Sequence, residues 1–204
     1  MTEMCNGKKY DFDRLTDRRG SGSYKWDVGE NELPMWVADM DFETAPCVKN
    51  AIIKRAEHGI FGYSVTPDEY FASISDFWAE RHGWRPDPSE MIFSTGVVAT
   101  ISSAVRKLTT PAEKVLIQAP VYNIFYNSVL NSGRVVLSSD LVLENGEYRM
   151  DFADLEEKLA DPQTTLMILC NPHNPVGRIW SREELAAVGC WLHLCRHRRI
   201  RGML

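Results

Sequence analysis

Apolar positions recur along the chain at two spacings, one typical of strands and one typical of helices. Short apolar runs predict strands over residues 91–94, 114–118, 134–138 and 165–170. Apolar residues at helical spacing predict helices over residues 44–57, 67–82, 97–108, 121–131 and 151–159. Because strands alternate with helices, we expect an α/β fold with a mostly parallel sheet flanked by helices.

Capping residues mark several of the expected helix ends. The stretch Thr66-Pro67-Asp68-Glu69 predicts a helix with Thr66 as its N-cap, and Gly83 marks the end of that helix. Ser181-Arg182-Glu183-Glu184 is a second capping box, and a further helix is expected near Thr44 with Pro46 in its first turn. Residues 1–43, punctuated by Gly, Ser and Asp, are expected to form an irregular arm.

The ends of the predicted strands are candidate ligand sites, because ligands of parallel sheets lie beyond the carboxyl ends of the strands. The first exit, Ser94-Thr95-Gly96-Val97-Val98, leads directly into a helix. Free N–H groups and the helix dipole suit an anion there, and Gly96 would let a phosphate approach closely. A plain strand-to-helix turn explains the same residues, and the chain contains no P-loop pattern GxxxxGK[ST].

Two further strand exits carry side chains suited to an aromatic ligand. Tyr122 could stack on a flat ring, although a tyrosine of the core or surface is the simpler interpretation. Asn171–Gly177 holds two Asn-Pro pairs and predicts a rigid loop from which Asn174 can donate to a ligand oxygen. A purely structural loop is the alternative. Cys170 and His173 could form a nucleophile pair, but we expect the cysteine to be buried in its strand and inert.

Composition is that of an ordinary globular protein. The 204 residues suggest one domain, or one and a part, with 44% hydrophobic and 25% charged residues. A formal net charge of −5 argues against a general nucleic-acid binder. Neither a membrane span nor the apolar segment of a signal peptide is visible. We therefore expect a cytoplasmic protein that binds neither nucleic acid nor membrane.

The candidate metal and acid groups are weak signals. Five cysteines, an odd number at wide spacing, predict reduced thiols: Cys5, Cys47, Cys170, Cys190 and Cys195. The tail adds His193 and His197 to two of these cysteines, but their spacing matches no closed zinc pattern, so no metal is expected. Asp39 and Asp41 could form an acid pair, and loop or cap roles are the simpler interpretation.

The strand exits together resemble the fold-type I pyridoxal-phosphate (PLP) enzymes, the aminotransferase class I and II superfamily. Leu33–Phe42 (LPMWVADMDF), Phe61-Gly62-Tyr63 and Asn171–Arg178 (NPHNPVGR) are similar to the cystathionine β-lyase, or cysteine-S-conjugate β-lyase, subgroup. The resemblance covers about residues 8–188. It implies the large PLP-binding α/β domain, with an incomplete sheet and no C-terminal small domain.

The resemblance assigns roles to individual positions. Gly96, Val97 and Val98 match the turn whose backbone holds the cofactor phosphate. Tyr122 matches the aromatic residue stacked on the pyridine ring, and Asn174 matches the amide that hydrogen-bonds the phenolic oxygen of that ring. Tyr63 matches a tyrosine that reaches the phosphate of the neighbouring subunit, which implies a homodimer. The segment implied to line the substrate pocket is Trp36, Val37, Ala38 and Asp39.

The activity that the resemblance implies is PLP-dependent carbon–sulfur β-lysis. Such an enzyme uses the cofactor as an electron sink and releases a thiol, ammonia and pyruvate from a sulfur-containing amino acid. An aminotransferase of class I and II is the alternative within the superfamily. A non-catalytic fragment that pairs with a full-length subunit is an alternative of another kind.

The chain departs from this pattern towards its C-terminus. The resemblance places the Schiff-base lysine beyond Asn174, yet the lysines all lie between Lys8 and Lys158. Residues 189–204 carry a charge of +4, against −9 for the first 188 residues. We expect an arm with the pocket-lining segment over 1–43, a partial PLP-binding domain over 44–188, and an atypical basic tail over 189–204 that suggests a frameshift. This implies no catalytic residue, no activity of the chain alone, and a sheet with exposed apolar edges.

Overall fold

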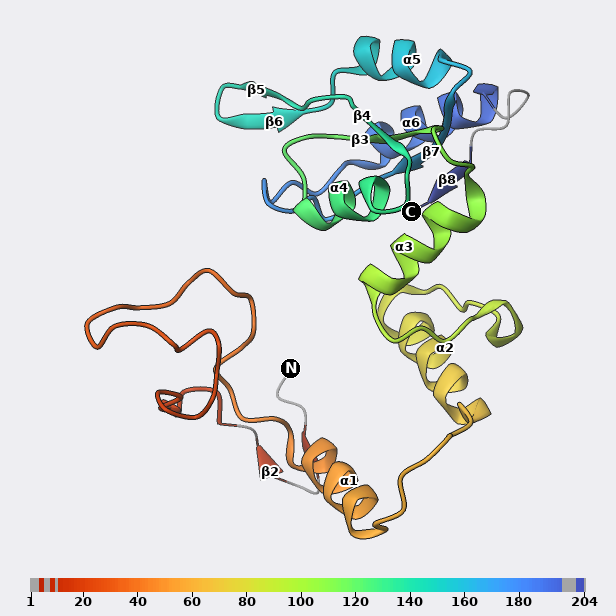
Figure 1. Cartoon of the computed structure of the whole chain (residues 1–204). Coiled ribbons are helices and arrows are strands. Elements are labelled where there is room, and N and C mark those ends of the chain that lie inside the picture. Colours follow the sequence, from red (N-terminus) through yellow and green to blue (C-terminus); the bar gives the residue numbers. More distant parts are fainter. Residues whose placement is uncertain (1–3, 6–7, 10, 196–200, 204) are drawn as a thin grey trace. The chain divides into compact units, whose positions relative to one another are not determined.

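The structure, a computed structural model, describes residues 4–5, 8–9, 11–195 and 201–203. The chain divides into two compact units, Met1–Val65 and Thr66–Leu204, and each has its own elements (Figure 1). In these described ranges no helix has the length and apolar character needed to cross a membrane.

The first unit is mostly irregular, as its Gly-, Ser- and Asp-rich sequence predicts. Its regular elements are the antiparallel pair β1 (Met4–Cys5) and β2 (Lys8–Lys9) and the helix α1 (Pro46–Glu57). Pro46 lies in the first turn of α1, where its missing N–H costs nothing. The N-cap is Ala45, next to Thr44, and no side chain caps the helix. None of the residues of α1 is buried, so this helix contributes no core.

A parallel four-stranded sheet lies at the centre of the second unit. Its strands are β3 (Lys114–Ile117), β4 (Val135–Ser138), β7 (Thr164–Ile168) and β8 (Arg201–Met203), in the order β4-β3-β7-β8. All neighbouring pairs run parallel. The central strands β3 and β7 are buried along nearly their whole length, as expected for a sheet covered on both faces. This confirms the α/β prediction.

Most helices of this unit pack on the two faces of the sheet, whereas the first of them, α2 (Asp68–His82), lies away from it (Figure 1). In chain order they are α2 (Asp68–His82), the 3₁₀ turn η1 (Pro88–Glu90), α3 (Val97–Leu108), α4 (Asn123–Leu130), α5 (Phe152–Ala160) and α6 (Arg182–Cys195). The predicted helices over 97–108 and 151–159 agree with α3 and α5 to within a residue or two.

Alternate residues of the central strands face two separate cores. Val115 and Ile117 of β3 pack with α3 and α4, in a cluster completed by Ile101, Val105, Val121, Phe125, Val129, Leu166 and Ile168. Leu116 of β3 faces the opposite core with α5 and α6, which holds Leu141, Met150, Leu155, Leu159, Met167, Leu169, Trp180 and Val188. The period-two alternation of a strand thus produces three layers, helices–sheet–helices.

Two predicted helix starts have different outcomes. The Ser181 capping box is confirmed: Ser181 Oγ accepts from the Glu184 N–H at 3.1 Å, and Glu184 Oε2 accepts from the Ser181 N–H at 2.6 Å. The Thr66 cap is wrong, because α2 begins at Asp68 with Pro67 in the N-cap position and no side-chain cap. Gly83 ends α2 as predicted, with a left-handed φ of 67° that favours glycine.

Residues 91–94 form no strand, contrary to the prediction. In the described structure this segment is extended but pairs with no strand, and Ile92 is 93% exposed. An apolar run predicts burial, whereas a strand also needs a neighbouring edge to pair with.

A hairpin and an added strand also differ from the prediction. Strands β5 (Val142–Glu144) and β6 (Glu147–Arg149) pair antiparallel around Asn145-Gly146, whose positive φ angles of 51° and 83° suit an Asn-Gly turn. In the predicted basic tail, β8 pairs with β7 as a strand that the sequence analysis did not predict.

Candidate functional site

The predicted phosphate turn opens helix α3 without any side-chain cap. Gly96 is the N-cap, and α3 begins at Val97. Val97 and Val98 are 75% and 44% exposed, so the first turn of this twelve-residue helix faces open space. The first N–H groups of a helix have no partner within it, and the helix dipole makes this end positive. The turn can therefore bind an anion through its backbone.

Gly96 is not required by the conformation or packing of the chain. Its φ of 165° is extended backbone that any residue adopts. A Cβ built at this position would meet no atom within 4 Å. The turn lines an open hollow of about 460 Å³, whose other walls include Tyr70 and Ile74 of α2. The hydrogen in place of a side chain thus leaves room for a ligand group against the backbone.

Tyr122 occupies the equivalent position on the next helix, as the N-cap of α4. Its ring is 41% exposed and meets Phe125 edge-to-face, with the ring centroids 6.2 Å apart. The Phe125 contact thus leaves part of the Tyr122 ring accessible. The tyrosine predicted to stack on a ligand is therefore a surface residue beyond the carboxyl end of strand β3.

Helix packing brings the phosphate turn and Tyr122 to the same end of two helices. Helix α3 precedes strand β3 in the chain and α4 follows it, and both helices run in the direction opposite to that strand (Figure 1). Ser102 Oγ and Ser128 Oγ share a hydrogen bond of 3.0 Å. Each serine stands five residues after the first residue of its own helix. The two helices therefore touch at corresponding positions, and Gly96 and Tyr122 are the N-caps of these two helices.

Asn174 lies in the loop that follows β7, directly beside the loop that follows β3. Its side chain is exposed, and its backbone N–H donates to Cys170 Sγ at 3.4 Å. The preceding residue, His173, is only 1% exposed and its Nε2 lies 3.1 Å from the Pro120 carbonyl oxygen. Pro120 precedes Tyr122 by two residues. This contact joins the two loops that carry the predicted ring-binding side chains, and the sequence analysis missed it.

Cys170 does not have the environment expected of it. It follows β7 rather than lying within it, and it is partly exposed. Its Sγ donates to the Pro172 carbonyl at 3.4 Å and accepts from Asn174. His173 instead turns its Nε2 to Pro120, so no cysteine–histidine pair is formed by these contacts. The thiol stabilises the loop.

The predicted pocket-lining segment belongs to the first unit and is held by a cluster of charges. Arg18 donates to Asp39 Oδ2 and to Asp41 Oδ1, both at 2.7 Å. Lys25, which is 9% exposed, donates to the Asp39 carbonyl at 2.8 Å and to Asp41 Oδ2 at 2.9 Å. Trp26 Nε1 donates to Asp41 Oδ1 at 2.7 Å. The two aspartates thus bind cationic side chains of their own unit and do not pair with each other in these contacts.

These donors change the acidity of Asp41. Hydrogen bonds from Lys25, then Trp26 and Arg18, hold the pKa of the Asp41 carboxyl far below its usual range. Asp39 uses one carboxylate oxygen for Arg18. The segment between Trp36 and Asp41 is therefore anchored at its C-terminal end.

The remaining predicted residues of this unit are largely exposed. Trp36 is 57% exposed and packs edge-to-face on Tyr24 at 4.8 Å between ring centroids. Val37 is half-buried, Ala38 is exposed, and Tyr63 is fully exposed. These side chains are accessible to a ligand or to another chain.

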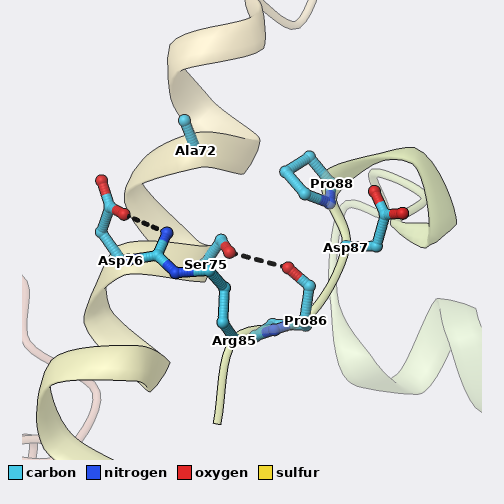
Figure 2. A pocket seen from close by; sticks show the side chains of 7 residues that line it. All are labelled: Ala72, Ser75, Asp76, Arg85, Pro86, Asp87 and Pro88. Atoms are coloured by element: carbon cyan, nitrogen blue, oxygen red, sulfur yellow. Dashed lines mark hydrogen bonds and ion pairs between the residues drawn. The ribbon is translucent and has the colours of Figure 1, made fainter. Parts of the chain in front are cut away.

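A second hollow, between α2 and the loop after it, has a structural explanation. Figure 2 shows its lining, which includes Asp76, Arg85 and Asp87, around a volume of about 350 Å³. Arg85 donates to Asp76 at 2.6 Å, and the buried Ser75 donates to the Pro86 carbonyl at 2.7 Å. Asp87 accepts from the Ser89 N–H, which lowers the pKa of Asp87. The polar groups pair with one another, so this hollow is a helix-to-loop junction.

The described residues contain no cluster of three or more His, Cys, Asp or Glu side chains able to hold a metal ion. Of the four tail residues considered as zinc ligands, His197 lies outside the described residues. The candidate site therefore consists of one uncapped helix start, one accessible aromatic ring and one exposed amide.

A comparison with protein families shows to which family the chain belongs. Residues 30–193 match the family described as "Aminotransferase class I and II". The chain belongs to this family. The match includes the turn at Gly96, Tyr122 and Asn174, which lie at one edge of the sheet.

Curated relatives extend the likeness over most of the chain. Cystathionine beta-lyase PatB of Bacillus subtilis (strain 168) is 48% identical over 185 residues, which cover 87% of this chain and 48% of the relative. Protein MalY of Escherichia coli (strain K12) is 32% identical over 199 residues, covering 94% of this chain and 50% of the relative. The chain thus spans about half the length of these relatives.

Solved structures give the same picture for the fold. Cystalysin of Treponema denticola, whose structure contains pyridoxal 5'-phosphate, is 30% identical with a TM-score of 0.86, over 96% of this chain and 51% of that one. A PLP-bound C–S lyase of Staphylococcus hominis is 34% identical with a TM-score of 0.83, over 95% and 50% of the two chains. The chain therefore has the fold of one half of these PLP proteins.

Proposed function

We propose that this chain forms the cofactor-phosphate and cofactor-ring binding part of a PLP-dependent carbon–sulfur β-lyase. The observation that carries the proposal is that Gly96 and Tyr122 are the N-caps of two helices that touch through Ser102 and Ser128, while the loop of Asn174 is hydrogen-bonded to the loop of Tyr122. An anion-binding turn, an aromatic face and an amide donor at one sheet edge match the three parts of a phosphorylated pyridine. The relatives named as cystathionine beta-lyases and C–S lyases support the reaction.

The residues of the site fit the proposed cofactor. The uncapped N–H groups after Gly96 bind the phosphate, and the open space at the missing Cβ admits it. Tyr122 stacks on the ring, and the exposed Asn174 amide donates to the phenolic oxygen. When bound, PLP would supply an electron sink that stabilises the charge left at Cα when its proton leaves, before that electron pair expels the thiol sulfur from Cβ. The chain's own part is to bind and orient that group.

The lysines of this chain serve structure rather than covalent attachment in our proposal. Lys114 pairs with Asp161 at 2.5 Å, Lys158 with Asp154 at 2.7 Å, and Lys25 with Asp41 at 2.9 Å. None of the chain's lysines lies beyond Lys158 in the sequence. We therefore assign binding of the cofactor, and no bond to it, to these residues.

Substrate and partner follow from the same proposal. The substrate class is a sulfur-containing amino acid, and Trp36, Val37, Ala38 and Asp39 line its pocket in the complete enzyme. Tyr63, which is fully exposed within its own unit, reaches the phosphate of a second subunit in a homodimer. The free thiols of Cys170 and Cys190 suit a reducing, cytoplasmic setting. An aminotransferase remains the second candidate, because the family itself includes that reaction.

Binding of pyridoxamine 5'-phosphate tests the proposal, because this form of the cofactor carries an amine and needs no lysine. We expect saturable binding to the chain by isothermal titration calorimetry. Asn174→Ala should weaken it about tenfold, the loss expected for one hydrogen bond to a charged oxygen.

The matched control is Asn131→Ala, which removes an exposed amide from the far end of α4 and should leave the affinity unchanged. Absence of binding to the unaltered chain would contradict the proposal. Equal losses of affinity in the two variants would show that Asn174 does not bind the cofactor.

A further inference from the structure

His173 is a polar side chain that the structure buries at the edge of the sheet. Its side chain is 1% exposed, although the loop around it is largely open. Its backbone is fixed on both sides: the His173 N–H donates to the Arg178 carbonyl at 2.7 Å, and its carbonyl accepts from the Gly177 N–H at 2.8 Å. The ring also meets Trp180 edge-to-face, with 5.4 Å between centroids. The imidazole is thus held in one place.

The hydrogen bonding of the ring defines its tautomer. Nε2 lies 3.1 Å from the Pro120 carbonyl oxygen, which can only accept, so Nε2 carries a proton. Nδ1 is buried and has no hydrogen-bond partner in the described structure. Burial also lowers the pKa of His173. A second proton on Nδ1 would place a buried charge at an atom that has no hydrogen-bond partner, which favours the neutral ring with its proton on Nε2.

The two ends of this hydrogen bond stand next to the two ring-binding side chains. Pro120 precedes Tyr122 by two residues on the loop after β3, and His173 immediately precedes Asn174 on the loop after β7. Strands β3 and β7 are neighbours in the sheet, but the backbone pairing between them ends before these loops begin. The His173–Pro120 bond is therefore a cross-link between the loops at the level of the site.

We propose that His173 is a positioning residue, whose Nε2–H···O=C bond to Pro120 sets the separation between the Tyr122 ring and the Asn174 amide. It touches neither the cofactor nor the substrate. The role rests on the proposed function, since the separation matters only if one ring lies between those two side chains. The phosphate turn at Gly96 is held by α3 and does not depend on this bond.

Two substitutions separate positioning from folding. His173→Leu keeps the bulk and removes the donor, whereas His173→Gln places an amide donor at about the same reach as Nε2. We expect His173→Leu to weaken pyridoxamine 5'-phosphate about tenfold and His173→Gln to stay within about twofold of the unaltered chain. The affinity for inorganic phosphate, which binds only at the turn, should be equal in all three proteins.

Leu155→Ala is the control for stability, because it empties a buried position on α5 and changes no polar contact. It should lower the midpoint of urea unfolding and leave both affinities unchanged. Unaltered pyridoxamine 5'-phosphate affinity in His173→Leu would overturn the proposal. A parallel loss of affinity for both ligands would also overturn it, because that result indicates a general structural defect.

Nuclear magnetic resonance of the unliganded chain tests the cross-link independently of cofactor binding. We expect the His173 ring to show a proton on Nε2 and a bare Nδ1 at neutral pH. His173→Leu should shift the Asn174 side-chain amide and the Tyr122 ring signals, and His173→Gln should restore them. A proton on Nδ1, or no shift in either signal, would overturn the inference. Failure of the unaltered chain to bind the ligand would instead contradict the proposed function alone.

Discussion

Asp41 shows how single residues fix the arm of the first unit. Its two carboxylate oxygens accept from Arg18, Lys25 and Trp26. A carboxylate bound by three donors is favoured over the carboxylic acid, which is why its pKa is far below the usual range. The charged form of Asp41 therefore holds together residues that lie 15 to 23 positions apart.

This arrangement predicts a specific dependence on pH. Because the folded pKa is depressed, Asp41 contributes its stability fully above the unfolded value of about 3.9, and the contribution is lost as pH falls towards the folded pKa. The signal of the Trp26 indole N–H should therefore stay in place from neutral pH down to about pH 4 and move only below it. Nuclear magnetic resonance of the indole protons during an acid titration checks this.

Asp41→Asn identifies the signal, since it should move the Trp26 indole resonance already at neutral pH. Movement of the indole signal of the unaltered chain above about pH 5 would contradict the assignment of Asp41 as its acceptor.

At the scale of elements, helix caps have local signals, which predicted the Ser181 cap correctly and the Thr66 cap wrongly. Asp151 is the N-cap of α5, and its Oδ1 accepts from the Ala153 N–H at 3.1 Å and the Asp154 N–H at 3.0 Å. Asp151→Ala should therefore lower the free energy of unfolding by about 1 kcal/mol. Urea unfolding measures the change, with the exposed Glu156→Ala on the same helix as the control. A difference of less than a few tenths of a kcal/mol between the two variants would show that the cap is not formed.

Elements that depend on distant partners were not predictable in the same way. The apolar run over 91–94 predicts a strand, but a strand forms only beside another strand, and sequence pattern does not specify the neighbour. The Asn145-Gly146 hairpin, in contrast, had a recognised local signal that the sequence analysis did not use. Ser181 was predicted correctly, because its cap involves residues three positions apart.

The same distinction applies to the site. Gly96, Tyr122 and Asn174 were singled out because each lies directly after an expected strand or at the start of a helix, and their roles stay predictions. His173 was considered only with Cys170, its neighbour in the sequence, whereas its partner Pro120 is 53 residues away. The Arg18 and Lys25 contacts with the aspartates were missed for the same reason, since they span 14 to 23 residues. The roles given to Tyr63 and to Trp36–Asp39 stay predictions.

At the scale of the whole molecule, the chain has about half the length of its relatives. Its three packed layers explain how it still holds the carboxyl ends of its strands in order. Two separate cores, one on each face of β3 and β7, hold the strand exits. Helices α3 and α4 on one face define the phosphate turn and Tyr122, and the loop after β7 adds Asn174. The elements proposed to bind the cofactor thus all belong to one unit, residues Thr66–Leu204.

The measurement that tests this account most directly is a titration of the isotope-labelled chain with pyridoxamine 5'-phosphate, followed residue by residue by nuclear magnetic resonance. The account predicts saturable shifts of the backbone amides of Gly96, Val97 and Val98, of the Tyr122 ring and of the Asn174 side-chain amide. Inorganic phosphate should move only the three amides of the turn. Shifts confined to other surfaces, or no saturable shift at these five residues, would contradict the claim that they form one cofactor site.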